Sequence, residues 1–272
     1  MSSPAERPES APQEAAAIVK RERDARGVVT LTLNRPQAFN ALSEALMASL
    51  QRELDALETD RSNARVLVLA GAGKAFCAGH DLREMRAKPS LEHYQRLFTQ
   101  CSQMMLTLRR LPIPVIARVH GIATAAGCQL VAQCDLAVAA SDARFAVSGV
   151  NLGLFCSTPG VPLSRNVPLK QAFEMLVTGD FIDAQEARER GLVNRVVAPE
   201  ALDSEVENLV AGILRKPRVA IALGKELFYR QSELPLAAAY EAASRTIAGN
   251  MMESVALEGV QAFIDKRAPR WE

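Results

Sequence analysis

Residues 120–135, HGIATAAGCQLVAQCD, are the stretch that decides the fold. A β-branched run at residues 114–119 (PVIARV) precedes it and predicts a strand that ends in a turn at Gly121. Small residues occupy 123–127, and an apolar helical pattern begins there. Small side chains let other atoms approach the backbone, and the first N–H groups of a helix have no internal acceptor. This corner is therefore either a site for an anion, or for a carbonyl oxygen that becomes negative during a reaction, or a place of tight helix packing.

A second corner of the same kind lies earlier in the chain. The short apolar run Val66–Leu69 predicts a buried strand, and the glycine turn 71–73 ends it. The following segment 74–85, KAFCAGHDLREM, places Gly79 and the N–H of His80 at another tight turn. Two such N–H groups aimed at one oxygen would form an oxyanion hole built from main chain. The alternative is two unrelated loops, and composition does not decide between them.

The composition is that of an ordinary globular protein. Of 272 residues, 49% are apolar and 23% charged, and the net charge of +1 gives no field for nucleic acid or an anionic membrane. No apolar run approaches the roughly 20 residues of a membrane-spanning helix. The five cysteines mostly lie in apolar runs without a disulfide-type framework, which predicts reduced thiols: Cys77, Cys101, Cys128, Cys134 and Cys156.

Residues 1–17 are rich in Pro, Ser, Glu and Ala and predict a disordered tail. They lack the apolar core of a signal peptide and the Arg-rich, acid-poor character of a transit peptide. Together with the reduced cysteines, this predicts a cytoplasmic protein.

Periodicity predicts mixed α/β structure up to about residue 200. Residues 28–33 alternate as a strand, Ser43 is a candidate N-cap for the helix that follows, and residues 151–162 read as a Gly/Pro loop. Beyond Leu202 the pattern is almost entirely helical. We therefore expect a core at 18–200 and a helical oligomerisation lobe at 201–272.

Several common chemistries are disfavoured. The glycines at 71–73 with Lys74 lack the spacing of a P-loop or a dinucleotide fingerprint. Three widely separated histidines do not make a metal site, and there is no G-x-S-x-G serine elbow. We expect no metal and no separate cofactor.

Taken together, the chain resembles the crotonase, or enoyl-CoA hydratase/isomerase, superfamily. Six segments carry the resemblance in the family's order: LNRPQAFNALS (33–43), KAFCAGHDLREM (74–85), PVIARVHGIATAAGCQLVAQCDLAVAA (114–140), FAVSGVNLGLFCSTPG (145–160), FIDAQEARERGLVNRVV (181–197) and AFIDKRAPRW (262–271). The resemblance implies an α/β fold, a spiral of β-β-α units with a C-terminal helical trimerisation lobe. It also implies a homo-trimer or hexamer and an acyl-CoA thioester as ligand, with coenzyme A as part of the substrate.

The resemblance also implies roles for individual residues. Backbone N–H groups of His80 and Ala126 would polarise the thioester carbonyl. Coenzyme A contacts carry over to the following positions: Ala38, Asp81, Leu82, Arg83, Phe263 and Lys266. The last two would reach the adenine and a phosphate, in some relatives from a neighbouring subunit.

The chain departs from the hydratases it resembles at the two catalytic glutamates. Gln129 stands at the first and Gly149 at the second, and Ser157 stands where some dehalogenase relatives carry an aspartate. An amide does not exchange a proton usefully near neutral pH, and each positioned acid or base contributes about 10²–10⁴ in rate. Of the remaining polar groups, Asp81 is a weak candidate base, and Cys156 or Ser157 is a nucleophile or a pocket wall.

Three hypotheses follow. The first is an acyl-CoA enzyme of the crotonase class that relies mainly on enolate stabilisation, with Gln129 or Ser157 assisting. The second is a non-catalytic acyl-CoA binder. The third is a true hydratase that uses unconventional residues.

Overall fold

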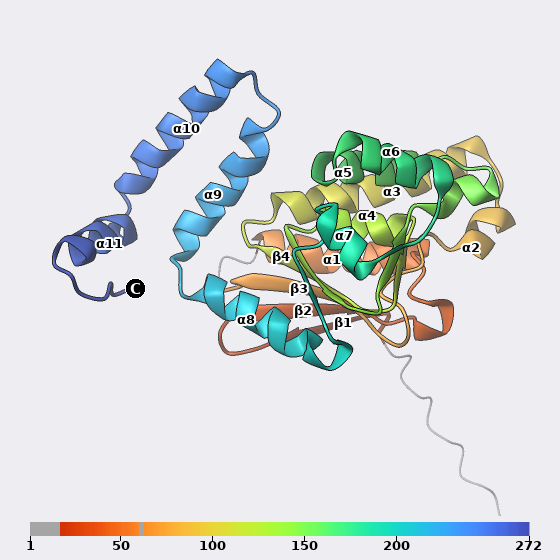
Figure 1. Cartoon of the computed structure of the whole chain (residues 1–272), viewed down its shortest axis with the longest axis horizontal. Coiled ribbons are helices and arrows are strands. Elements are labelled where there is room, and N and C mark those ends of the chain that lie inside the picture. The colour runs from red at the N-terminus through yellow and green to blue at the C-terminus, as the bar shows by residue number, and fades with distance from the viewer. Residues whose placement is uncertain (1–16, 60–62, 272) are drawn as a thin grey trace, which may run out of the picture.

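The computed structural model describes residues 17–59 and 63–271. Its framework is a six-stranded sheet in the order β1-β2-β3-β4-β6-β9, antiparallel between β1 and β2 and parallel elsewhere (Figure 1). The strands of this sheet are β1 (Val19–Arg23), β2 (Val28–Leu33), β3 (Val66–Gly71), β4 (Val115–Val119), β6 (Leu136–Ala140) and β9 (Arg195–Val197). The mixed α/β fold with a largely parallel sheet confirms the predicted fold class.

A second, three-stranded sheet has the order β5-β7-β8. Its strands are β5 (Ile122–Thr124), β7 (Arg144–Ala146) and β8 (Ile182–Asp183). β5 pairs with β7 in parallel, and Cys77 forms an isolated bridge to Ala123 of β5. The segment after β3 is thereby joined to the segment after β4, and these are the two corners singled out in the sequence.

Helices cover both faces of the large sheet. On one face lie α1 (Glu44–Thr59), α2 (Leu82–Ala87), α3 (Leu91–Arg110), α4 (Ala126–Gln133), α5 (Ser157–Asn166), α6 (Leu169–Thr178) and α7 (Ala184–Glu189). On the other face lies α8 (Leu202–Leu214), visible beneath the strands in Figure 1. Short 3-10 turns complete the chain: η1 (Pro36–Ala38), η2 (Ser148–Leu152) and η3 (Pro199–Ala201).

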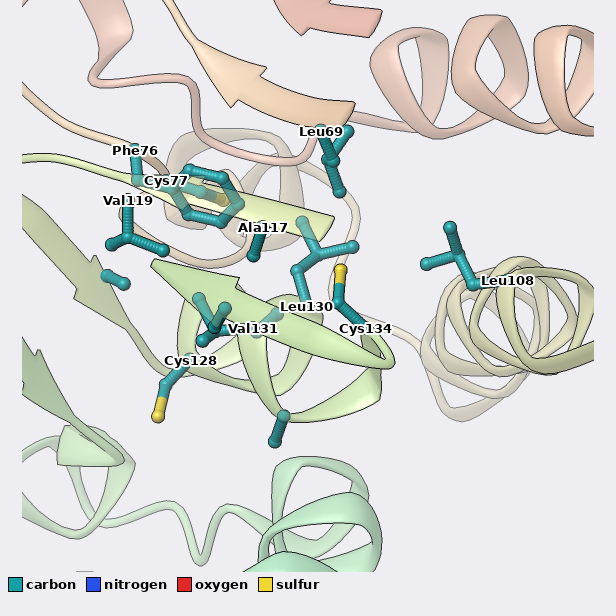
Figure 2. Packing of buried hydrophobic residues seen from close by; sticks show 14 of the residues in the cluster. Leu69, Phe76, Cys77, Leu108, Ala117, Val119, Cys128, Leu130, Val131 and Cys134 are labelled. Carbon is teal, nitrogen blue, oxygen red and sulfur yellow. The ribbon is translucent and has the colours of Figure 1, made fainter. Parts of the chain in front are cut away.

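Alternation along β3 explains why the sheet is buried on both sides. Leu67 and Leu69 join the main core, whereas Val66 and Val68 pack in a second cluster with residues of α8. Figure 2 shows the main core around α4, where apolar side chains of the two corners interdigitate. The continuous apolar character of this strand is what a strand covered on both faces requires.

The last three helices leave the body of the molecule. α9 (Arg218–Gln231) and α10 (Leu236–Met251) run side by side, and α11 (Ser254–Ile264) follows at the far end (Figure 1). A buried ion pair joins α9 to the core, since Lys225 Nζ lies 2.7 Å from Asp135 Oδ2, and Tyr229 Oη donates to Asp135 Oδ1 at 2.7 Å. The boundary placed at residues 200 and 201 stays a prediction; α8 packs on the sheet, and α9 to α11 extend away from it.

The strand predicted at 28–33 is β2, and the predicted cap of α1 is confirmed, since Ser43 Oγ accepts from the N–H of Leu46 at 3.1 Å. Gly191 follows α7 with a left-handed φ of +80°. The loop predicted for 151–162 is wrong in its second half, because α5 begins at Ser157 and continues through Pro162. Pro159 lies in the first turn, where a missing N–H is harmless, and burial of α5 against α4 outweighs the bond lost at Pro162.

Two further predictions concern the N-terminal tail and membrane-spanning helices. The tail predicted for residues 1–17 falls outside the described residues except for Ala17. Within 17–59 and 63–271, none of the helices combines the length and the apolar character needed to cross a membrane.

Candidate active site

The first corner is held in place by backbone hydrogen bonds on both sides of Gly79. Leu42 donates its N–H to the Gly79 oxygen at 2.7 Å, and Asp81 donates to the Leu42 oxygen at 3.1 Å. On the other side, Thr124 donates to the Cys77 oxygen at 3.0 Å. Gly79 itself has a φ of +91°, a conformation that a side chain would disfavour. The sequence therefore folds this turn through glycine and through contacts from residues far away in the chain.

The second corner is the start of α4. Ala125 precedes the helix with φ 49° and ψ −118°, and its N–H donates to the Ala146 oxygen at 2.9 Å. The positive φ falls on Ala125 and not on Ala126, which is the first helical residue. Ala126 therefore has a helical backbone conformation that accommodates its Cβ, and the unusual conformation falls on the residue before it.

The two corners touch. A Cβ placed on Gly79 would lie 3.0 Å from the Cβ of Ala125 and 3.4 Å from the nitrogen of Ala126. A Cβ on Gly127 would lie only 2.0 Å from the Cys77 oxygen. Glycine at both positions therefore allows the segment that follows β3 and the segment that follows β4 to approach this closely.

Two N–H groups at this contact have no backbone acceptor within the described chain. The bridge between Leu42 and His80 uses the neighbouring groups of Gly79 and Asp81 and leaves the N–H of His80 unused. The N–H of Ala126 is the first of α4 and has no acceptor within the helix. Both predicted residues are therefore brought to one place by the fold.

The side chain of His80 is a feature that sequence reasoning did not treat. Both ring nitrogens are buried without a hydrogen-bond partner, and the ring packs edge-on against Phe98 of α3, with centroids 5.3 Å apart. Burial lowers the pKa of this imidazole to about 4, so the ring is neutral at pH 7. The only signal available in the sequence was an imidazole next to the corner glycine.

Asp81 has a structural role. It is the N-cap of α2, where its carboxylate accepts from the N–H groups of Arg83 and Glu84, and Arg35 Nη2 lies 3.0 Å from its Oδ2. Partial burial alone would raise the pKa of Asp81, but the bonds from Arg35 and Glu84 hold it below its usual value. A carboxylate so engaged is a poor general base.

The Arg35–Asp81 pair also joins the predicted coenzyme A segments. It ties η1, which contains Ala38, to the start of α2, where Leu82 and Arg83 are exposed. Asn40, which sequence reasoning passed over, is fully buried and donates through Nδ2 to the oxygens of Ala72 and Ala75, both at 2.8 Å. By contrast, Phe263 (85% exposed) belongs to α11 and Lys266 lies just beyond it, and α11 is far from α2 (Figure 1).

Gln129 lies one turn into α4 and is 3% exposed, and its Oε1 is buried without a hydrogen-bond partner. Ser157 is exposed at the first position of α5, and its hydroxyl donates to the Phe155 oxygen at 3.3 Å. The fold therefore buries Gln129 beside the corner and leaves Ser157 at the surface with a purely local hydrogen bond.

Cys156 occupies the space in front of Gly149. The N–H of Gly149 donates to Cys156 Sγ at 3.2 Å, and a Cβ on Gly149 would lie 2.7 Å from that sulfur and 2.6 Å from the Leu154 oxygen. Burial raises the pKa of the Cys156 thiol and raises those of Cys77 and Cys128 to about 12. These thiols are protonated at neutral pH, which fits pocket walls better than nucleophiles.

Comparison with known proteins identifies the class to which this fold and corner belong. The family model described as enoyl-CoA hydratase/isomerase matches residues 23–272, so the chain belongs to that family. Among its relatives is the mitochondrial enoyl-CoA hydratase domain-containing protein 3 of Xenopus laevis, 45% identical over 90% of this chain and 83% of the relative. The human protein of the same name is 42% identical over 90% of this chain and 80% of the relative.

Solved structures of proteins in the same family are also similar to this chain. A crystal structure of an enoyl-CoA hydratase from Mycobacterium smegmatis has a TM-score of 0.93 and 65% identity, covering 94% of this chain and 99% of that one. The crystal structure of human enoyl-CoA hydratase domain-containing protein 3 has a TM-score of 0.89 and 42% identity, covering 94% and 100%. The family indicated by the sequence motifs is thereby confirmed.

The prediction of a cytoplasmic protein is wrong by the same comparison. Five relatives from frog, rat, mouse, human and zebrafish carry the word mitochondrial in their names. The prediction rested on reduced cysteines and on an N-terminus without transit-peptide character. A reduced thiol is compatible with more than one compartment, and an address read by a receptor is not encoded in the fold.

Proposed function

We propose that this protein binds an acyl-CoA thioester and polarises its carbonyl between the N–H groups of His80 and Ala126. The observation that carries the proposal is the contact of Gly79 with Ala125 and Ala126, which brings two unused N–H groups to one corner. Preorganised N–H groups stabilise the negative charge that develops on a thioester oxygen when an enolate forms. The start of α4 adds the positive end of its dipole.

The coenzyme A part would lie along η1 and the start of α2. Ala38 offers backbone and little bulk, Leu82 an exposed apolar surface, and Arg83 a cation for phosphate. Asp81 contributes indirectly by capping α2 and fixing Arg35. No separate cofactor is needed, because coenzyme A belongs to the substrate.

The remaining two coenzyme A contacts require a second copy of the chain. Phe263 belongs to α11 and Lys266 lies just beyond it, and α11 is at the opposite end of the molecule from α2 (Figure 1). In a homo-trimer or hexamer, the lobe of one subunit would bring them to the site of a neighbour. An aromatic ring for adenine and an ammonium group for phosphate are suitable partners.

Hydration is disfavoured as the main reaction. Gln129 does not exchange a proton usefully, Gly149 has no side chain, and Asp81 is engaged in capping. Reactions that need mainly enolate stabilisation remain, and decarboxylation of a malonyl-type thioester demands the least acid/base help. The alternatives are a non-catalytic acyl-CoA binder and a hydratase with unconventional residues.

One experiment separates these hypotheses. The purified full-length chain is incubated with saturated, enoyl and malonyl-type CoA thioesters, and binding and turnover are measured on the same samples. We expect binding of thioesters with slow hydration of crotonyl-CoA. Binding without any turnover would favour the non-catalytic binder, rapid hydration would refute the roles assigned to Gln129 and Gly149, and absence of binding would overturn the proposal.

A further inference from the structure

A groove runs over the exposed side of α3, beside the corner that holds His80. It has a volume of about 480 Å³ and is mostly apolar, and its lining residues are Leu91, Tyr94, Gln95, Phe98, Thr99 and Ser102. Tyr94 Oη donates to the Met85 oxygen at 3.2 Å, which ties the groove to the end of α2. Phe98 belongs both to this groove and to the contact with the His80 ring.

The His80 ring therefore stands between the corner and the groove. Its backbone N–H lies at the corner, and its imidazole meets Phe98 edge-on at 5.3 Å, with an angle of 84° between the rings. Backbone bonds from Leu42 to the residues on either side fix the position of the chain here. The backbone of His80 is therefore fixed beside the proposed carbonyl site, and the ring packs from there against Phe98.

We propose that His80, packed against Phe98, closes the corner toward α3 and limits the acyl group to short chains. This inference rests on the proposed function, because it concerns the acyl end of the same thioester. The coenzyme A end is assigned to η1 and α2, so the acyl chain leaves the carbonyl on a different side. The groove offers apolar surface for a longer chain, and the imidazole blocks the way to it.

The volume of the ring is the property that acts against a long alkyl chain, because the ring stands between the corner and the groove. Its two nitrogens are buried without any bound chain, so their polarity does not discriminate between chain lengths. Volume and polarity are separable by substitution. Leucine retains a similar volume without polar atoms, whereas alanine removes the volume and leaves the N–H of residue 80 in place.

The test compares butyryl-CoA with octanoyl-CoA by isothermal titration calorimetry on the full-length protein. We expect the unmodified chain to bind butyryl-CoA about tenfold more tightly than octanoyl-CoA, a ratio typical of steric discrimination in an apolar pocket. His80→Ala should remove or reverse this preference, and His80→Leu should retain it. Phe98→Ala should open the passage from the groove side, which keeps the test valid if His80→Ala does not fold.

Leu106→Ala is the matched control, since Leu106 is 47% exposed on α3 and does not line the groove. It should leave the ratio unchanged. Equal binding of the two thioesters by the unmodified chain would overturn the size filter and leave the proposed function intact. A loss of the preference for butyryl-CoA in His80→Leu as large as that in His80→Ala would also overturn the size filter. If none of the proteins bound either thioester, the proposed function would be refuted as well.

Discussion

Ala125 carries the least favourable backbone conformation at the candidate site. Its φ of 49° with ψ of −118° lies in a region that glycine adopts easily and alanine does not. Strain of this kind costs about 1–3 kcal/mol and persists only where surrounding contacts enforce it. Here the enforcing contacts are the bond from Ala125 to Ala146 and the approach of Gly79.

Ala125→Gly should therefore raise the free energy of unfolding by about 1 kcal/mol, because glycine relieves the positive φ. Urea denaturation monitored by circular dichroism measures the difference. Ala126→Gly is the control, since Ala126 is helical and its replacement should lower stability by about 0.5–1 kcal/mol. Equal effects of the two substitutions would contradict the assignment of strain to Ala125.

The buried imidazole of His80 makes stability depend on pH. Burial depresses its pKa from 6.5 to about 4, so the unfolded chain binds more protons than the folded chain between these values. Stability is therefore fully present above pH 6.5 and is lost as the pH falls toward 4. At about 1.4 kcal/mol per pKa unit, the loss is on the order of 3 kcal/mol.

We expect the free energy of unfolding of His80→Leu to fall less between pH 7 and pH 4 than that of the unmodified chain. Taking the difference between the two proteins cancels the contributions of carboxylates and of the other two histidines. His120→Leu is the comparison, because it removes a second imidazole, the one that directly follows β4. Parallel stability curves for His80→Leu and the unmodified chain would show that this ring is not the one responsible.

At the scale of elements, signals confined to one helix or strand were predictable from sequence. The alternation of β2, the continuous apolar run of β3 and the Ser43 cap of α1 all express local chemistry. α5 was not predictable, because two prolines and a glycine weigh against a helix and only its burial against α4 favours one. The three residues of β5 are too short for a periodicity, yet they join the two corners.

The segment from η2 to α5 bears on whether two introduced glutamates would give a hydratase. Cys156 Sγ and the Leu154 oxygen fill the space that a side chain at Gly149 would enter. We expect the double substitution Gln129→Glu with Gly149→Glu to give less than about a tenfold gain in crotonyl-CoA hydration, although each placed acid or base is worth 10²–10⁴. The reason is that the second carboxylate displaces the loop instead of pointing at the substrate.

Steady-state hydration of crotonyl-CoA measures this outcome, and thermal unfolding reports the displaced loop. Gly149→Ala should lower the free energy of unfolding by about 1–3 kcal/mol through overpacking. Gly212→Ala in α8 is the control, since a Cβ there would meet only an arginine nitrogen at 3.8 Å, and it should be neutral or stabilising. A gain of several hundredfold in the double variant would mean that the loop adapts without cost.

At the scale of the whole molecule, the site depends on contacts that no local pattern contains. The corners that follow β3 and β4 are about 45 residues apart in sequence. The residue pattern left open whether they meet, and the family resemblance favoured it. His80 was identified for its N–H, but the partner of its ring, Phe98, comes from α3 and was not foreseen. The sequence shows which residues could take part in the site, but the distances between them are known only from the fold.

The projecting lobe leads to the last prediction. α10 and α11 expose large apolar side chains that a monomer would leave in water: Leu236 (75%), Tyr240 (69%), Ile247 (60%), Phe263 (85%) and Ile264 (64%). Exposed apolar surface of this extent marks an interaction site. Since the coenzyme A contacts assigned to Phe263 and Lys266 need a neighbour, we expect a particle of three or six times the chain mass of 29.5 kDa.

Light scattering coupled to size exclusion measures that mass. Leu236→Glu combined with Ile247→Glu should dissociate the particle, because charges replace apolar contacts in the interface. The same variant should bind CoA thioesters more weakly, since each site loses the contacts from its neighbour. Leu91→Glu is the control, a leucine of nearly equal exposure (73%) on α3, and it should leave the mass unchanged. Dissociation without any loss of thioester affinity would place Phe263 and Lys266 outside the binding site. A monomeric unmodified chain would show that the lobe does not mediate assembly.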